Sequence, residues 1–122
     1  MPFAMEWPAM PIEIEFIVPQ VRTKSSVAKQ DIKSAYRQVI WEASNGWRPD
    51  SGKQYVVYAR ATCSSQRANL PDIENVTKEI VDAVFPDDSV RVVKGIQMEA
   101  EVVGVGRSQE RTRIRICHIT GD

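Results

Sequence analysis

The chain has 122 residues, which suits one domain with its own hydrophobic core and is too short for two. Hydrophobic residues make up 43% of the sequence and charged residues 26%, a composition that excludes an intrinsically disordered chain. Lys and Arg together number 16, as do Asp and Glu, so the zero formal net charge excludes a globally basic nucleic-acid-binding protein but leaves local basic patches open.

The first eleven residues are predicted to form an extended lead-in to the folded domain. Three of them are prolines, which interrupt regular structure. The segment has neither a basic start nor an apolar run long enough for a signal peptide or a membrane span. We therefore expect one domain over residues 12–122 of a cytoplasmic protein with no membrane partner.

The next two segments predict a strand followed by a helix. Residues Ile12 to Val18 begin with alternating apolar and acidic side chains, which is typical of a strand with one buried face, and Pro19 ends it. Apolar residues then recur at helical spacing between residues 26 and 43, where we expect an amphipathic helix. The Asn45-Gly46 pair predicts its end.

A second strand, a second helix and three further strands are expected in the rest of the chain. Residues 55–62 are rich in β-branched and aromatic side chains. Apolar side chains recur at helical spacing from residue 72 until Pro86, and residues 90–93, 99–103 and 112–119 again have the composition of strands. The predicted order β-α-β-α-β-β-β indicates an α+β fold, in which two helices cover a mixed sheet.

The two cysteines, Cys63 and Cys117, are predicted to be free thiols. They lack the close spacing of a zinc knuckle and are too few for a disulfide scaffold. Cys117 precedes the lone His118, but neighbours in a strand point to opposite faces and make a poor pair of metal ligands.

The segment from Asp72 to Asp88, with the sequence DIENVTKEIVDAVFPDD, concentrates acidic residues. One interpretation of its start is purely structural. Asp72 would cap the second helix and Glu74 would be a favourable acid in its first turn, where free N–H groups and the helix dipole favour negative charge.

The other interpretation is a metal site. The polar face of the helix adds an amide and further charged groups, at Asn75, Lys78, Glu79 and Asp82. The dyad Asp87-Asp88 follows the helix, and a strand starting there can run back toward Asp72. Clustered carboxylates repel one another unless a cation or protons compensate, and hard cations prefer carboxylate oxygens. The segment therefore favours a site for Mg²⁺, with Mn²⁺ as the alternative cation.

The same segment resembles the signature of the RusA family of Holliday junction resolvases, D-x-D-N-x-x-K-x-x-x-D followed by an acidic dyad and a strand. The residues that carry the resemblance are Asp72, Glu74, Asn75, Lys78, Asp82, Asp87, Asp88 and Val90. IEFIVP is similar to the family's opening strand, and Ser34-Ala35-Tyr36-Arg37 is similar to its first helix. The resemblance covers most of the chain from Ile12 to Lys94.

The resemblance implies a homodimeric, Mg²⁺-dependent endonuclease that cuts two opposed strands of a four-way DNA junction. The metal ligands would be Asp72, Glu74 and Asp88, with Asp87 as the alternative from the dyad. The essential lysine would be Lys78, which would hold a phosphate oxygen while the cation activates water. Short resolvases of this kind are often encoded by phages or integrated elements.

Basic residues outside the segment are the expected DNA contacts, at Arg22, Lys24 and Arg67. The homodimer surface is expected on the first strand or the first helix, which carry Phe16 and Tyr36. Two other functions stay open. Glu74 stands where the family pattern has aspartate, which permits a DNA-binding module that has lost catalysis. A metal-dependent hydrolase of small phosphoesters is the third possibility.

Overall fold

A computed structural model describes residues 11–21, 30–50, 52–67, 73–85 and 92–119. Its regular elements, in chain order, are β1 (Ile12–Val18), α1 (Gln30–Ala43), β2 (Tyr55–Ser64), α2 (Ile73–Val84), β3 (Val93–Val103), the 3-10 helix η2 (Arg107–Gln109) and β4 (Arg111–His118). The α+β class and the mixed sheet with two helices are confirmed.

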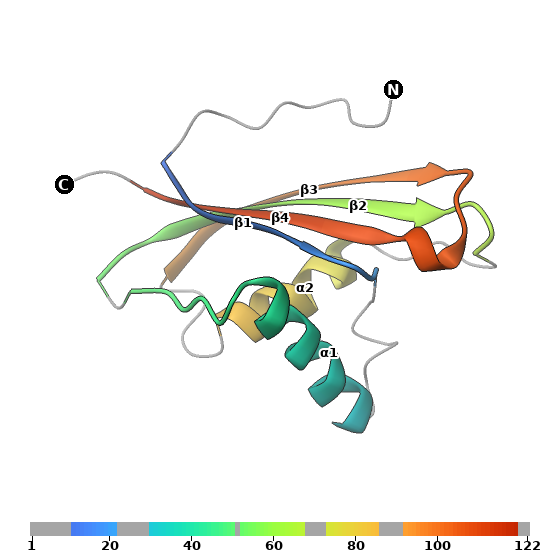
Figure 1. The fold of residues 1–122 in the computed structure, drawn as a ribbon. Helices are drawn as coiled ribbons and strands as arrows, with labels where there is room; N and C mark the ends of the chain where they lie inside the picture. Colours follow the sequence, from blue (N-terminus) through green and yellow to red (C-terminus); the bar gives the residue numbers. More distant parts are fainter. Residues whose placement is uncertain (1–10, 22–29, 51, 68–72, 86–91, 120–122) are drawn as a thin grey trace.

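The four strands form one sheet in the order β1-β4-β2-β3. β4 is antiparallel to both β1 and β2, whereas β2 and β3 are parallel and α2 lies between them in the chain. Parallel neighbours need a crossover connection, and α2 provides it. Figure 1 shows the strands as one layer with both helices below it.

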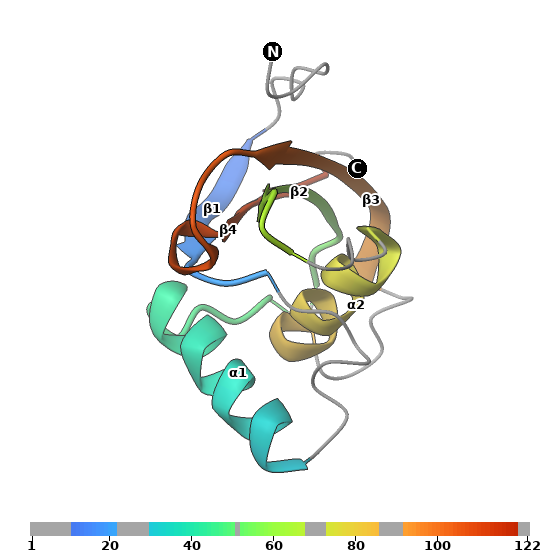
Figure 2. The same cartoon turned by 90° about the vertical axis from the view of Figure 1, so that its right-hand side faces the viewer.

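The two helices cover different parts of the same face of the sheet. α1 contacts β1, α2 contacts β3, and the helices pack against each other. Figure 2, turned by 90°, shows α1 toward the β1 side and α2 toward the β3 side. The opposite face of the sheet carries no helix among the described residues.

The core lies between the sheet and the helices. β2 supplies Tyr55, Val57 and Ala59, which are at most 1% exposed, and α2 supplies Ile80 and Val84, each 1% exposed. Both neighbours of β2 are strands and one of its faces is covered by helices, so the strand is buried along most of its length. Burial of such apolar side chains is the main stabilising term, at roughly 25 cal/mol per Å².

An aromatic cluster closes one end of this core. Trp47 stands edge-on to Tyr55, with ring centroids 5.5 Å apart, and to Phe85, at 6.0 Å. Tyr55 and Phe85 are also in contact, with centroids 5.6 Å apart. The hydroxyl of Tyr55 accepts a hydrogen bond from the backbone N–H of Asp50 at 2.8 Å, which satisfies the polar end of a buried ring.

Two expectations differ from the structure. Residues 93–103 form one continuous strand, because β3 pairs with β2 over its whole length, whereas the sequence predicted two strands within 90–103. Phe16 and Tyr36 are 6% and 2% exposed and belong to the core, so neither aromatic side chain is available at a dimer surface. The start of the first predicted helix, residues 26–29, lies outside the described residues.

The end of α1 follows the sequence prediction. Asn45 and Gly46 both have positive φ, at 53° and 70°, and the N–H of Gly46 bonds the carbonyl of Trp41 at 2.8 Å. This left-handed turn satisfies a terminal carbonyl of the helix. A Cβ at position 46 would lie 2.7 Å from Cζ2 of Trp41, so the site requires glycine for its conformation and for its space.

Replacing Gly46 with alanine is expected to lower the free energy of unfolding by about 1–2 kcal/mol, because the side chain would be strained at positive φ and would clash with Trp41. Urea denaturation measures this change. The matched control is Gly104→Ala, since nothing lies within 4 Å of a Cβ there. Equal stability of the two variants would contradict the prediction.

Candidate functional site

α2 presents the central part of the acidic segment to solvent. Val76, Ile80 and Val84 are each 1% exposed and form the buried stripe of the helix. Lys78 is exposed and Asp82, one turn later, is half-buried. The spacing of apolar and charged residues therefore produces the helix face that the sequence predicted for these two side chains.

Glu79 differs from the prediction, which placed it on the exposed face. Glu79 is buried, with only 3% of its surface exposed, and its Oε2 atom has no hydrogen-bond partner among the described residues. The physical reason is that α2 contacts both the sheet and α1, so it buries a wider arc than its apolar stripe alone. A buried carboxylate oxygen without a partner is costly, and such groups often mark a functional role.

Most of the other predicted site residues lie outside the described residues, namely Asp72, Asp87, Asp88, Arg22 and Lys24. Glu74 lies in the first turn of α2, but its side chain is not described. Among the described residues, no group of three or more His, Cys, Asp or Glu side chains is arranged to hold a metal ion.

The described ends of α2 limit how the predicted metal ligands can meet. The helix spans Ile73–Val84, and the buried Phe85 continues it with a bond from its N–H to the Val81 carbonyl. At 1.5 Å per residue, positions 73 and 85 are about 18 Å apart. Three further residues span at most about 10 Å. Asp88 can therefore share a cation with Asp72 only if the chain runs back along α2.

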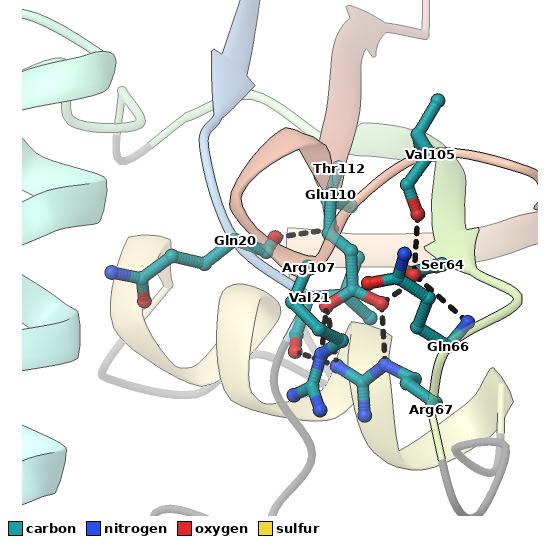
Figure 3. Close-up of polar contacts among 9 residues, drawn as sticks. All are labelled: Gln20, Val21, Ser64, Gln66, Arg67, Val105, Arg107, Glu110 and Thr112. Carbon is teal, nitrogen blue, oxygen red and sulfur yellow. Dashed lines mark hydrogen bonds and ion pairs between the residues drawn. The ribbon is translucent and has the colours of Figure 1, made fainter.

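A second polar centre lies at the end of β2, around Glu110 (Figure 3). The side chain of Glu110 is 4% exposed. Its Oε2 accepts hydrogen bonds from Nε of Arg67 at 2.5 Å and from the backbone N–H of Ser64 at 2.8 Å, and its Oε1 accepts from Nη2 of Arg67 at 2.9 Å. This is a bidentate, charge-assisted pair, the strongest geometry for arginine and carboxylate.

The network around this pair joins segments that are far apart in the sequence. Arg67 also donates from Nη2 to the carbonyl of Val21 at 2.7 Å, just after β1. Ser64 donates from Oγ to the carbonyl of Val105 at 2.5 Å. Arg67 thus has a described role in holding the fold together, and its contact with DNA stays a prediction.

The network controls the protonation of Glu110. Burial by itself would raise the pKa of this carboxyl group, but the hydrogen bonds from Arg67 and Ser64 and the positive charge of Arg67 outweigh it and lower the pKa below its ordinary value. Glu110 therefore stabilises the fold as a carboxylate.

The sequence analysis did not single out Glu110. Its main partner, Arg67, is 43 residues away in the chain, and no local sequence pattern predicts a pairing between such distant residues.

The two cysteines are free and buried, as predicted. Burial raises the pKa of both thiols, which makes them less reactive as nucleophiles. The imidazole Nδ1 of His118 lies 3.5 Å from a carboxylate oxygen of Glu13, on the neighbouring strand β1.

The arginines of β4 are largely paired across the sheet. Arg113 and Arg115 both bond Glu15 on β1, at 3.1 Å and 2.5 Å. On the other side of β4, Arg60 of β2 pairs with Glu99 of β3 at 3.4 Å. Because each of these cations is engaged by a neighbouring acid, this face is a weaker candidate for binding a phosphate backbone than a face with unpaired basic residues.

Comparison of the sequence with known protein families and with curated proteins finds no match. Among the described residues, no helix is both long enough and apolar enough to cross a membrane.

Acid is expected to destabilise the protein partly through Glu110. A carboxyl group with a lowered pKa stabilises the fold above its ordinary value of 4.5, and this stabilisation is lost as the pH falls through the lowered value. Thermal unfolding between pH 7 and pH 3 measures the effect. Glu110→Gln should lower the free energy of unfolding at pH 7 by about 3 kcal/mol and flatten its dependence on acid pH. The exposed Glu42→Gln is the control and should keep the parent profile.

Replacing Glu79 with methionine is expected to raise the free energy of unfolding by about 1 kcal/mol, because a buried oxygen without a described partner is exchanged for an apolar group of similar length. Urea denaturation measures the change. The exposed Glu42→Met should stay within about 0.5 kcal/mol of the parent. A marked loss of stability in the Glu79 variant would show that this carboxylate has a favourable partner.

Proposed function

We propose that this protein is a divalent-metal-dependent endonuclease that resolves four-way DNA junctions by paired cleavage of opposed strands. The observation that supports it best is the exposure of Lys78 on α2. The helix begins at Ile73, directly after Asp72, and carries Lys78 exposed while its apolar residues are buried. A cationic side chain is thereby free to meet a phosphate beside the acidic start of the helix.

The roles of the proposed residues follow from their chemistry. Asp72, Glu74 and one residue of the dyad, Asp88 or Asp87, would hold Mg²⁺ or Mn²⁺ through carboxylate oxygens. The cation, when bound, supplies an activated water and neutralises charge on the scissile phosphate. Lys78 would donate to a non-bridging phosphate oxygen and stabilise the charge that develops there.

The burial of Glu79 adds support from an independent direction. It lies next to Lys78 in sequence and three residues before Asp82, it is 3% exposed, and its Oε2 has no hydrogen-bond partner among the described residues. Proteins tend to retain such unfavourable groups where they serve a function. In the proposed site, Glu79 would orient Lys78 or a ligand of the cation.

DNA contacts are expected from basic residues outside the acidic segment. The proposed contacts are Arg22, Lys24 and Arg67. Arg67 is 13% exposed and uses Nε and Nη2 in the pair with Glu110, so any contact with phosphate would fall to its Nη1.

A DNA-binding module of the same fold without catalysis is the second candidate, because Glu74 stands where the family pattern has aspartate. The extra methylene moves the carboxylate by about 1.5 Å, which matters when Mg²⁺ requires distances near 2.1 Å. Calorimetry with Mn²⁺ distinguishes the candidates, since a module without catalysis would bind branched DNA but no metal.

Incubation with a synthetic four-way junction and Mg²⁺ is expected to give symmetric nicks. Asp72→Asn should reduce cutting by at least about 100-fold and leave junction binding intact, because it removes a metal ligand and a charge that repels DNA. Lys78→Ala should reduce cutting by about 100-fold, far more than binding. Gel electrophoresis of end-labelled strands measures cutting, and mobility shift measures binding.

The matched control is Lys53→Ala. Lys53 is an exposed lysine outside α2, paired with Glu13 and Asp50, and its removal should leave cutting within about twofold of the parent. A folded parent protein that binds Mn²⁺ and the junction but makes no nicks would overturn the proposed activity. Cutting that survives Asp72→Asn would overturn the assignment of the metal site.

A further inference from the structure

Two arginines share one buried carboxylate at the end of the sheet where β2 ends and β4 begins. Arg107 lies three residues before Glu110 and donates from Nε to its Oε1 at 3.2 Å. Nη2 of Arg67 bonds the same Oε1 at 2.9 Å, so the two guanidinium groups lie side by side (Figure 3). We call Arg67 and Arg107 the arginine pair.

The arginine pair carries more positive charge than Glu110 compensates. Glu110 brings one negative charge to two guanidinium groups, and no second acid among the described residues forms an ion pair with either arginine. Arg67 and the backbone N–H of Ser64 already bond both oxygens of Glu110, so the charge of Arg107 is in excess. Because like charges side by side repel each other, a second anion at the pair would be stabilising.

Arg107 keeps its two terminal nitrogen atoms for a ligand. Its side chain is 57% exposed, and its hydrogen bond to a described residue is made by Nε. Arg67 has Nη1 left, since its Nε and Nη2 atoms bond Glu110 and Val21. The nitrogen atoms of a guanidinium group form a planar fork that matches the oxygens of a phosphate. Because Glu110 orients this fork in advance, less side-chain entropy is lost when a ligand binds.

The arginine pair lies on the helix-bearing side of the sheet, near the start of α2. Arg67 donates from Nη2 to the carbonyl of Val21 at 2.7 Å, and Val21 belongs to the same buried cluster as Cys63 and Val76. Val76 is the fourth residue of α2 and precedes Lys78 by two positions. The pair therefore borders the part of the helix on which we propose the metal and phosphate site.

The surface around the pair consists of hydrogen-bonding side chains without exposed acids. η2 contacts the end of β2, and the exposed residues on these two segments are Ser65, Gln66, Ser108 and Gln109. Among residues 64–67 and 104–110 the one acid is the buried Glu110. Proteins use arginine, hydroxyl and amide groups together to contact the phosphates and sugars of nucleic acids. The surface extends beyond a single anion and suits a strand.

We propose that the arginine pair binds a phosphate group of a nucleic-acid strand, with Arg107 making the main contact and Glu110 holding both arginines in position. The proposal rests on the proposed function for the identity of this strand, a strand of the DNA junction. Lys78 and the arginine pair would then hold two separate phosphates beside the start of α2. The pair holds no metal, so it affects binding of the junction and not the chemical step.

Mobility shift of a four-way junction in EDTA, which removes the cation, tests the role of Arg107. Arg107→Ala should raise the Kd at least about fivefold and lower the slope of log K against log salt concentration by about 1, because one phosphate contact is lost. Arg107→Lys keeps the charge and should restore the slope. At saturating protein in Mg²⁺, Arg107→Ala should cut within about twofold of the parent rate, unlike Lys78→Ala.

The matched control is Arg111→Ala. Arg111 is exposed and directly follows Glu110, but it pairs in register with Thr62, whose neighbour Ala61 belongs to the buried cluster beside α2. Its side chain therefore points to the other face of the sheet. This variant should keep the Kd within about twofold of the parent and the salt slope unchanged. Thermal unfolding checks that both alanine variants fold, since exposed ion pairs contribute little stability.

Calorimetry with inorganic phosphate separates a site for a strand from a site for a small anion. The parent should bind inorganic phosphate at least about 100-fold more weakly than the junction, because the single ion lacks the neighbouring phosphates. Inorganic phosphate that binds as tightly as the junction, and loses this binding in Arg107→Ala, would overturn the proposed strand.

An unchanged Kd and salt slope in Arg107→Ala, or an equal loss in Arg111→Ala, would overturn the inference even where the parent cuts the junction. Conversely, a parent that binds the junction through Arg107 and makes no nicks in Mg²⁺ would overturn the proposed activity and leave the inference standing. A parent that binds no DNA would overturn both.

Discussion

The packing of α2 against the helix-bearing face of the sheet is the interaction on which the other features depend. β2 is the only described strand with an antiparallel neighbour on one side and a parallel neighbour on the other, and the parallel pairing requires a crossover through α2. Burial of Val76, Ile80 and Val84 fixes the rotation of this helix about its axis. That rotation in turn determines that Lys78 reaches solvent and that Glu79 does not.

Two buried acidic side chains on this framework differ in how their oxygen atoms are satisfied. Glu110 accepts bonds from Arg67, Arg107 and a backbone N–H, which compensates its loss of hydration and ties the ends of β1 and β2 to the start of β4. Glu79 has one oxygen without a described partner. Glu110 therefore stabilises the fold. Glu79 is an unfavourable group in α2, the helix on which we propose the metal and phosphate site.

The distribution of charge separates the two faces of the sheet. On the face without a described helix, arginines are engaged in cross-strand pairs such as Arg115 with Glu15 and Arg60 with Glu99. The helix-bearing face holds the exposed Lys78 of α2.

Local patterns in the sequence were sufficient for most of the elements and for much of the helix face, although they divided β3 into two strands. Alternation located β1 exactly at Ile12–Val18, and helical spacing located the buried stripe of α2 and the exposure of Lys78, because these patterns depend only on the geometry of one element. The Asn45-Gly46 turn followed from backbone preferences in the same way.

The burial of particular side chains depends on contacts between distant segments, and these contacts are seen only in the tertiary structure. Glu79 is buried because α2 contacts both the sheet and α1, and Glu110 is paired with Arg67, 43 residues away. The packing of the sheet and helices likewise placed Phe16 and Tyr36 in the core. Pairing between remote residues leaves no periodic trace in the chain, so the sequence determined most of the elements and the acidic segment, and the fold alone determined which acidic side chains are buried.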